Sequence, residues 1–372
     1  MKSNYKALYE LVERIDERNS DGSVTDLLGV SIDKCFIKSV ANTNGTDLTK
    51  YKVIRKDDFA VSLMQVSRDS KIPVARLDEY DKAIMSPAYP IFRVKDKKVI
   101  LPEYLDMWFK RPEFDREAAF IAVGGVRGSM PWEEFEKMQL PVPPIEEQLE
   151  IVASYKAITD RIALKRRIND NLEAAMRALF EHFVVSNEAY DFDEAIDDKI
   201  DFINGLAMQN YRPEKDETPI PVIKIRELSQ GYCDENSEFC SNHIDKSHII
   251  QNGDLVFSWS GSLQASFWTS QTAGLNQHLF KVQSDEYPLW FVYEWVTFHL
   301  LNFQRIAENK GTTFGHIKRE DLHNAKIKSV GIDEINKLNN LFQPLLNTII
   351  ANSTELHSLM SYQRVLLARL SR

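Results

Sequence analysis

The 372-residue chain is too long for one ordinary hydrophobic core, so we expect at least two domains. Apolar residues make up 43% and charged residues 27%, a balance that excludes a disordered or low-complexity chain. The formal net charge of −9 argues against strong unaided binding to nucleic acid, because phosphate contacts need lysine and arginine. Local basic patches remain compatible with this charge.

The first part of the chain carries short runs of β-branched and aromatic residues. KVIRKDDFAVSLM at residues 52–64 and YPIFRVK at 89–95 are bounded by Gly, Asn, Asp and Pro, and they predict strands. At Leu140, the sequence LPVPPIEEQLEIVASY places three prolines within four residues directly before a helical pattern. Because proline restricts its own backbone and that of the preceding residue, this elbow should begin the helix at a fixed angle.

A heptad pattern follows the elbow and predicts a coiled-coil helix from about residue 147 to about residue 185. Such a helix would be roughly 55–60 Å long. The same alternation of three- and four-residue steps returns near the end of the chain. The predicted interface positions are Ile151, Tyr155, Ile158, Ile162, Leu172, Met176 and Leu179 in the first helix, and Leu338, Phe342, Leu345, Ile349, Leu356, Leu359 and Leu366 in the second.

Polar residues interrupt both apolar seams near their middle. These are Lys165 and Asn169 in the first helix and Asn352 in the second, and a buried polar group of this kind fixes the register at some cost in stability. We expect the two helices to pair antiparallel. The alternative is two ordinary amphipathic helices, each docked on its own domain.

The second half again carries strand-like runs, PVIKIREL at residues 221–228 and HLFKVQ at 278–283. The most hydrophobic run, YPLWFVYEWVTFHLL at residues 287–301, is too short to span a bilayer and contains Glu294 and His299. It therefore predicts a buried amphipathic helix. The start of the chain lacks the apolar core of a signal peptide, so we expect a cytoplasmic protein.

The two halves are copies of one unit. Gly128 aligns with Gly315 and Ile151 with Leu338, each pair separated by the same 187 positions (315 − 128 and 338 − 151). YKVIRKDDFAVS aligns with SHIIQNGDLVFS, and LPEYLDMWF with YPLWFVYEW. We therefore predict a mixed α/β (α+β) fold, in which two globular domains are separated by two long antiparallel coiled-coil helices in an internal pseudo-twofold repeat.

The sequence contains no motif of a known catalytic site. It has no P-loop, no GxGxxG that opens a helix, no GxSxG and no HExxH. Glu308 begins ENK, half of a nuclease motif, but no acidic partner stands on a neighbouring predicted strand, so we interpret it as a solvated helix end. Cys35, Cys233 and Cys240 form no CxxC pair and, with His243, lack a fourth zinc ligand. We predict reduced thiols, no metal site and no catalytic residues.

Several of these segments resemble specificity subunits of type I restriction-modification systems. They are LLGVSIDKCFIKSVANTNGTDLTKYKVIRKDDFAVS, GGVRGSMPWEEFEKMQLPVP, the segment from Leu140 to Phe183, NGDLVFSWSGS, GLNQHLFKV and KGTTFGHIKREDL. The resemblance covers nearly the whole chain and includes its two-copy organisation. One departure is the second elbow, IKSVGIDEI, which lacks the prolines usual there.

The resemblance implies four segments and a set of partners. The segments are a target recognition domain with a short N-terminal helix at residues 1–146, a central coiled-coil helix at 147–186, a second target recognition domain at 187–332 and a distal coiled-coil helix at 333–372. Each recognition domain would bind one half of an asymmetric, split double-stranded DNA site, and the helix pair would set the spacer. Two adenine methyltransferase subunits and up to two ATP-driven motor-nuclease subunits would carry S-adenosylmethionine, ATP and Mg²⁺, with no cofactor in this chain.

Polar and basic residues beside the aligned landmarks are the predicted DNA contacts, since arginine binds guanine bidentately and glycine lets the backbone approach phosphate. They are Arg68, Lys71, Arg127 and Ser129 in the first half, and Ser258, Ser260, Gln277, His278, Thr313, His316 and Lys318 in the second. For each residue, a solvated or capping role is the alternative. The alternative for the whole chain is a coiled-coil scaffold that binds proteins without recognising DNA, or an enzyme whose site carries no familiar motif.

Overall fold

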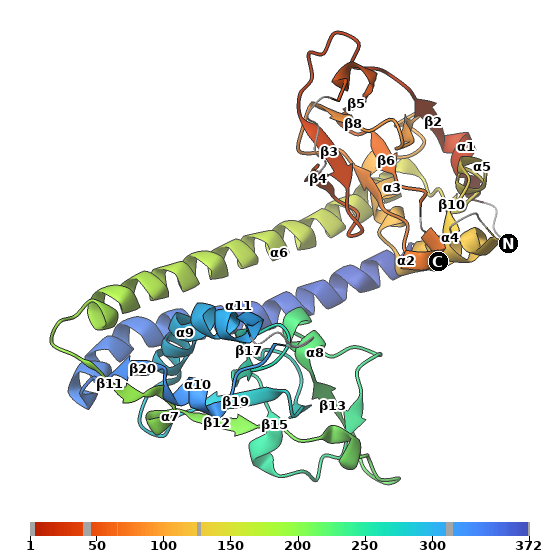
Figure 1. Cartoon of the computed structure of the whole chain (residues 1–372). Helices are drawn as coiled ribbons and strands as arrows, with labels where there is room; N and C mark the ends of the chain where they lie inside the picture. The colour runs from red at the N-terminus through yellow and green to blue at the C-terminus, as the bar shows by residue number, and fades with distance from the viewer. Residues whose placement is uncertain (1–3, 40–45, 65, 125–127, 310–314, 371–372) are drawn as a thin grey trace. The chain divides into compact units, whose positions relative to one another are not determined.

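The computed structural model describes residues 4–39, 46–64, 66–124, 128–309 and 315–370 (Figure 1). The chain divides into two compact units. Unit 1 comprises residues 1–159 and 362–372, and unit 2 comprises residues 160–361. Each unit combines β-sheets with parts of two long helices, which confirms the predicted mixed α/β class. The limits of the four predicted segments stay predictions.

The described residues of unit 1 form ten short strands in three sheets, with orders β2-β9-β6-β7, β4-β3-β8-β5 and β1-β10. Its elements are β1 (Tyr5–Ala7), α1 (Leu8–Leu11), β2 (Val12–Ile15), β3 (Leu27–Val30), β4 (Phe36–Lys38), β5 (Lys52–Arg55), β6 (Phe59–Val61), α2 (Val66–Asp69), β7 (Val74–Arg76), β8 (Lys82–Met85), β9 (Ile91–Val94), α3 (Pro102–Phe109), α4 (Pro112–Ile121), α5 (Trp132–Phe135) and β10 (Gln139–Pro141).

Unit 2 repeats this arrangement, with orders β12-β19-β16-β17, β14-β13-β18-β15 and β11-β20. Its elements are β11 (Phe192–Ala195), α7 (Ile196–Lys199), β12 (Asp201–Asn204), β13 (Ile220–Ile223), α8 (Ile225–Gln230), β14 (Phe239–Cys240), β15 (Ile249–Ile250), β16 (Leu255–Ser258), β17 (Ala265–Phe267), β18 (Ala273–Leu275), β19 (Leu279–Gln283), α9 (Leu289–Asn309), α10 (Arg319–His323) and β20 (Lys326–Lys328). The long helices are α6 (Ile145–Phe180), which ends in a π-helical turn (Glu181–Val185), and α11 (Ile332–Arg369).

The internal repeat is confirmed strand by strand. Each strand of unit 1 corresponds to the strand of unit 2 numbered ten higher, and the strand orders are identical. The registers agree as well: Phe59 pairs with Phe92, and Leu255 pairs with Val282 at the equivalent place. Among the named strands of the described residues, each unit also has one parallel pair, β3 with β8 and β13 with β18, and the other pairs are antiparallel.

Aromatic side chains fill the core of unit 1 between its sheets and helices. The rings of Phe59 and Phe92, on adjacent strands, stack with centroids 5.2 Å apart. Phe109 of α3 and Phe135 of α5 meet Phe92 at 6.0 and 5.6 Å. The strand-like run at residues 52–64 forms β5 and β6. Phe59 and Val61 of β6 face this core, whereas Ile54 of β5 packs in a separate cluster.

Helix α9 forms the centre of the unit 2 core and confirms the amphipathic helix predicted at residues 287–301 (Figure 1). Trp290 stacks on Phe342 of α11 with ring centroids 4.2 Å apart, and Trp295 meets Phe180 of α6 at 5.0 Å. The other face of α9 contacts β17 and β19. Within the residues that the structure describes, no helix is long and apolar enough to cross a membrane.

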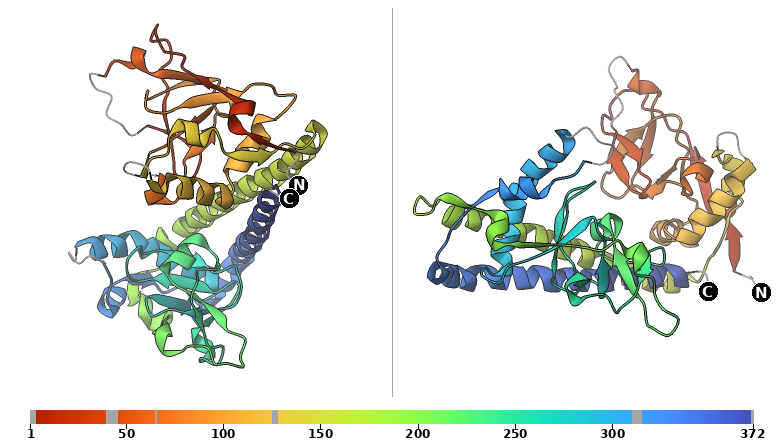
Figure 2. Two further views of the ribbon diagram at one scale, coloured as in Figure 1. Left: turned by 90° about the vertical axis from the view of Figure 1, so that its right-hand side faces the viewer. Right: turned by 60° about the horizontal axis from the view of Figure 1, so that its bottom comes forward.

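Helices α6 and α11 pair antiparallel, as Figure 2 allows the reader to follow. In unit 2, Arg161 bonds to Glu355, and Asn169, further along α6, bonds to Ile349 and Ser353, earlier on α11. All 14 predicted interface residues are buried or partly buried. Several of them also join the core of a unit, so the helices serve both as a pair and as core helices.

The polar residues predicted to interrupt the seams meet one another inside unit 2. The Asn352 side-chain amide donates to Asn169 Oδ1 at 2.9 Å, and Asn169 donates to Ser353 Oγ at 2.9 Å. Lys165 Nζ donates to Asn352 Oδ1 at 2.6 Å and pairs with Glu355 at 2.9 Å. Both asparagines are buried. The interface between the two helices therefore contains a buried network of side-chain hydrogen bonds.

The two elbows are anchored differently. At the first, the fully buried Gln148 accepts a bond from the Leu101 N–H and donates to the carbonyls of Val99 and Pro143, which ties α6 to unit 1. The equivalent residue at the start of α11 is the buried Ile335. Apolar packing therefore takes the place of the proline-rich, hydrogen-bonded elbow in the second copy.

Candidate nucleic-acid interface

A cavity of about 500 Å³ in unit 2 collects several of the predicted DNA contacts. It lies where β16 ends, beside the loop before β19 and the start of α8. Its lining residues are Ile225, Trp259, Ser260, Gly261, His278 and His316.

The turn after β16 shapes this cavity. The buried Ser258 hydroxyl donates to the carbonyl of Ser262 at 2.6 Å and lies 3.2 Å from that of Ser260. Gly261 has a φ of +65°, and its N–H donates to the carbonyl of Gly315 at 2.9 Å. A Cβ added to Gly315 would lie 2.6 Å from a backbone oxygen of α9, so only glycine fits this crossing.

Aromatic rings form one wall of the cavity. Trp259 lies with its ring centroid 5.7 Å from that of His278 and 6.4 Å from that of His316. Behind it, the Phe280 ring is 6.0 Å away and is covered by the guanidinium group of Arg319 at 4.9 Å. The Ser260 hydroxyl lies 3.2 Å from His278 Nδ1, so the polar edge of the cavity is ordered as well.

The DNA contacts predicted in the second half differ in their position relative to the cavity. Ser260, His278 and His316 line the cavity, and Gln277 lies beside His278 with their Nε2 atoms 3.4 Å apart. Ser258 instead closes the turn, and a direct contact by its hydroxyl would require that turn to open. Two further positions were predicted: Lys318 is exposed at the start of α10, and Thr313 lies outside the described residues.

Unit 1 has a cavity of about 410 Å³ at the equivalent place, lined in part by Ser62, Leu63, Met64 and Ala88. Backbone hydrogen bonds establish the equivalence. The Ser62 N–H donates to Pro73 as the Ser258 N–H donates to Gln264, at 2.8 and 2.9 Å. The carbonyls of Leu63 and Trp259 likewise accept from Met130 and Ile317, at 2.9 and 3.0 Å.

The equivalent positions carry different chemistry. Leu63, Met64 and Ala88 of unit 1 stand where unit 2 has Trp259, Ser260 and His278. At these three positions the shared scaffold therefore carries aliphatic side chains in unit 1 and aromatic or hydrogen-bonding side chains in unit 2, whereas Tyr51 and Tyr89 also line the unit 1 cavity.

Three of the four first-half predictions lie on described segments of unit 1. Arg68 is exposed on α2 and pairs with Asp69 at 2.9 Å, and Lys71 lies 4.0 Å from Asp33. Ser129 follows Gly128, whose φ is +73° and where a side chain would collide with the Ser67 hydroxyl. The structure thus brings Arg68 and Ser129 to adjacent segments. Arg127 lies outside the described residues.

A buried ion pair holds the loop between α2 and β7. Lys34 Nζ lies 2.8 Å from Asp115 of α4, and the same carboxylate accepts the Ile72 N–H at 3.0 Å. Burial lowers the pKa of Lys34, while Asp115 opposes that shift. The pair connects three segments of unit 1 and fixes the loop that carries Lys71.

No protein-family model matches the chain. Over 302 residues, which are 74% of this chain and 69% of the relative, it is 23% identical to the MjaIX specificity subunit of a type I restriction enzyme from Methanocaldococcus jannaschii. Over 101 residues, 27% of this chain and 21% of the relative, it is 29% identical to the EcoBI specificity subunit from Escherichia coli. The chain is similar to type I specificity subunits. The resemblance stated from the sequence segments is thereby confirmed.

A solved structure supports the same fold. The specificity subunit of a type I restriction-modification system from M. genitalium matches with a TM-score of 0.58 at 13% sequence identity. The match covers 99% of this chain and 96% of that subunit. At this identity, the likeness supports the architecture of two sheet-containing units and long helices.

Trp259 is the cavity residue that sequence reasoning passed over. It stands in FSWSGS between two serines that were chosen for their polarity, and an aromatic residue in such a turn was the available signal. Ile225 gave no signal, because its place beside Gly261 depends on the parallel pairing of β13 and β18.

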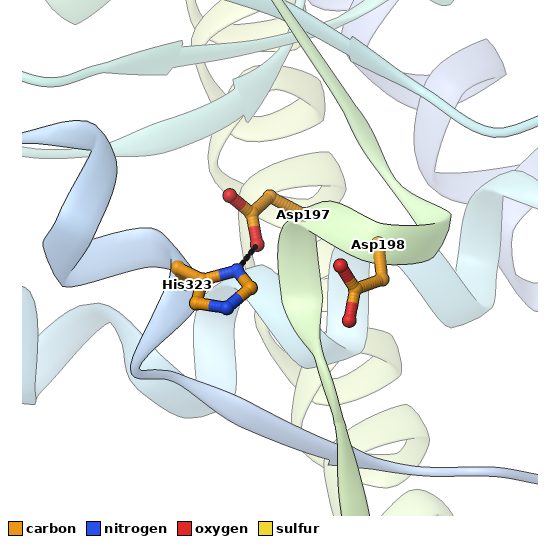
Figure 3. Close-up of side chains that lie close together, drawn as sticks. All are labelled: Asp197, Asp198 and His323. Atoms are coloured by element: carbon orange, nitrogen blue, oxygen red, sulfur yellow. Dashed lines mark hydrogen bonds and ion pairs between the residues drawn. The ribbon is translucent and has the colours of Figure 1, made fainter.

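A second cluster, Asp197, Asp198 and His323, has the donor types of a metal site (Figure 3). Each of the two acids already has a local partner. Asp197 Oδ1 lies 3.0 Å from His323 Nδ1, and Asp198 accepts the Ala195 N–H at 3.2 Å at the start of α7. These contacts account for the cluster as a capped helix turn and a side-chain hydrogen bond. The prediction that the chain holds no metal stays a prediction.

The three cysteines are free thiols, as predicted. Burial raises the pKa of Cys233 to about 12 and that of Cys240 to about 11. Both thiols are therefore protonated and unreactive at neutral pH.

Proposed function

We propose that this chain is the DNA-specificity subunit of a type I restriction-modification complex. The similarity to two curated specificity subunits supports the proposal. In this role, each unit binds one half of an asymmetric, split DNA site.

One observation carries the proposal: the two equivalent cavities have unlike linings. A duplicated scaffold with equivalent residues Leu63 and Trp259, or Ala88 and His278, can recognise two different base sequences in the same geometry. Base edges differ in their donors, acceptors and methyl groups, so unlike side chains at one place give unlike specificities.

In this proposal, the chain binds and positions DNA but does not carry out the chemistry. Two adenine methyltransferase subunits dock on it and supply S-adenosylmethionine, and up to two motor-nuclease subunits supply ATP hydrolysis and Mg²⁺. The antiparallel pair of α6 and α11 sets the spacing between the half-sites, and its central network of Asn169 and Asn352 keeps the register constant.

The acidic charge of the chain fits a subunit that works inside a complex. With a net charge of −9, the free chain should bind DNA weakly, since most non-specific affinity comes from neutralised phosphates. Partner subunits that surround the DNA would supply those contacts. Affinity should therefore depend on the methyltransferase subunits and fall steeply with salt.

The decisive experiment compares adenine methylation at single-base resolution across a genome. Cells that express this chain with its methyltransferase subunit are compared with cells that lack only the chain. We expect a split motif with two unlike halves that disappears with the chain. Methylation that is unchanged without the chain would refute the proposal and favour a scaffold that binds proteins only.

A further inference from the structure

The cavity beside Trp259 has the features of a binding site for a flat aromatic ring. Trp259 and Ile225 provide apolar surface, and the imidazoles of His278 and His316 stand at its edge. His278 is exposed and His316 partly buried, so a ligand can reach both rings from solvent.

The size of the cavity favours a whole ring over a single methyl group. Pockets that bind small molecules have volumes of roughly 300–1,000 Å³, and this cavity of about 500 Å³ falls within that range. A thymine methyl group, the usual apolar contact to a stacked base, would leave most of it empty. Stacking on tryptophan, combined with polar groups at the ring edge, is how proteins hold unstacked bases.

We propose that this cavity binds one nucleobase of the half-site recognised by unit 2, after that base has left its stack in the duplex. This inference rests on the proposed DNA-specificity function. The Trp259 ring stacks against the base, and His316, His278 and the Ser260 hydroxyl contact its polar edge. The base is distinct from the adenine that a methyltransferase subunit takes into its own site.

The repeat provides a matched variant. Leu63 occupies the position of Trp259 in unit 1. Its carbonyl accepts from the Met130 N–H, as the Trp259 carbonyl accepts from the Ile317 N–H. The substitution Trp259→Leu therefore installs a residue that this scaffold accommodates, and it removes the stacking surface without adding charge. Leu63→Ala serves as the control in the other unit.

The test uses the full chain with its methyltransferase subunits and a duplex that carries the methylated motif. A mismatch is introduced, one position at a time, in the half-site that unit 2 recognises. The base pair of the methylated adenine stays unchanged throughout. A mismatch weakens pairing and makes unstacking easier, so at one position the wild-type complex should bind at least fivefold more tightly than it binds the matched duplex. Trp259→Leu should abolish this gain and weaken binding to the matched duplex about tenfold.

The outcomes separate this inference from the proposed function. If the motif depends on the chain but no mismatch in either strand of that half-site tightens binding, the cavity does not hold an unstacked base, although the specificity role stands. A gain that persists in Trp259→Leu also overturns the inference. Leu63→Ala should leave the gain intact, and methylation that is independent of the chain would refute the function itself.

Discussion

The hydrogen-bond network between the two long helices leads to a quantitative prediction. Asn169→Leu leaves the buried Asn352 amide without its acceptor, and Asn352→Leu leaves Asn169 Oδ1 without its donor. Each single change should lower the free energy of unfolding by about 1–3 kcal/mol, the cost of an unsatisfied buried polar group. The double change removes both amides and should be within about 1 kcal/mol of wild type or more stable.

The assay is urea denaturation of the full chain followed by tryptophan fluorescence. Trp259, Trp268, Trp290 and Trp295, four of the six tryptophans, lie in unit 2. Trp290 stacks directly on Phe342 of α11, so its emission reports separation of that helix from the core. Asn171→Leu, at an exposed position two residues from Asn169, is the control and should change stability little.

The double-mutant cycle decides the question. A coupling energy of at least about 1 kcal/mol between the two asparagines is expected for groups in one network. If the two single effects simply add, the amides do not act together. The argument for a register-fixing network would then be wrong, although the helix pair itself would remain.

Two further predictions concern unit 2. Burial raises the pKa of Glu294 from 4.5 to about 7, so the folded state keeps a proton that the unfolded state releases, and stability should fall as pH rises between these values. Glu294→Gln should remove up to about 3 kcal/mol of this loss in the free energy of unfolding, measured by urea denaturation at pH 5 and pH 8. The control, Glu308→Gln at an exposed position, should leave the loss in place. An unchanged pH dependence in Glu294→Gln would contradict the assignment. Gly315→Ala should cost about 1–3 kcal/mol by the same assay, because its Cβ meets the backbone of Ala307. Gly331→Ala, with open space around it, is the control, and equal costs at the two glycines would argue against a tight crossing.

Regular patterns in the sequence predicted the larger architecture. The heptad seam from Ile151 onward and its copy from Leu338 identified both long helices, because helix periodicity imposes a repeating apolar stripe on the sequence. The constant offset between Gly128 and Gly315 identified the duplication. The run at residues 287–301 was identified as a helix by its length and polarity, and α9 contains most of it.

Which residues line the unit 2 cavity depended on the tertiary structure. Ser258 and Ser260 look alike in sequence, yet one closes the turn after β16 and the other lines the cavity. Trp259, His278 and His316 lie on separate segments, and the register of β16 with β19 and the contact between Gly261 and Gly315 bring them together. Local sequence patterns determine which elements form, whereas the direction of a side chain in a turn depends on non-local hydrogen bonds that leave no periodic trace. The sequence therefore determined the duplicated helical framework, and tertiary packing decided which residues meet at the cavity.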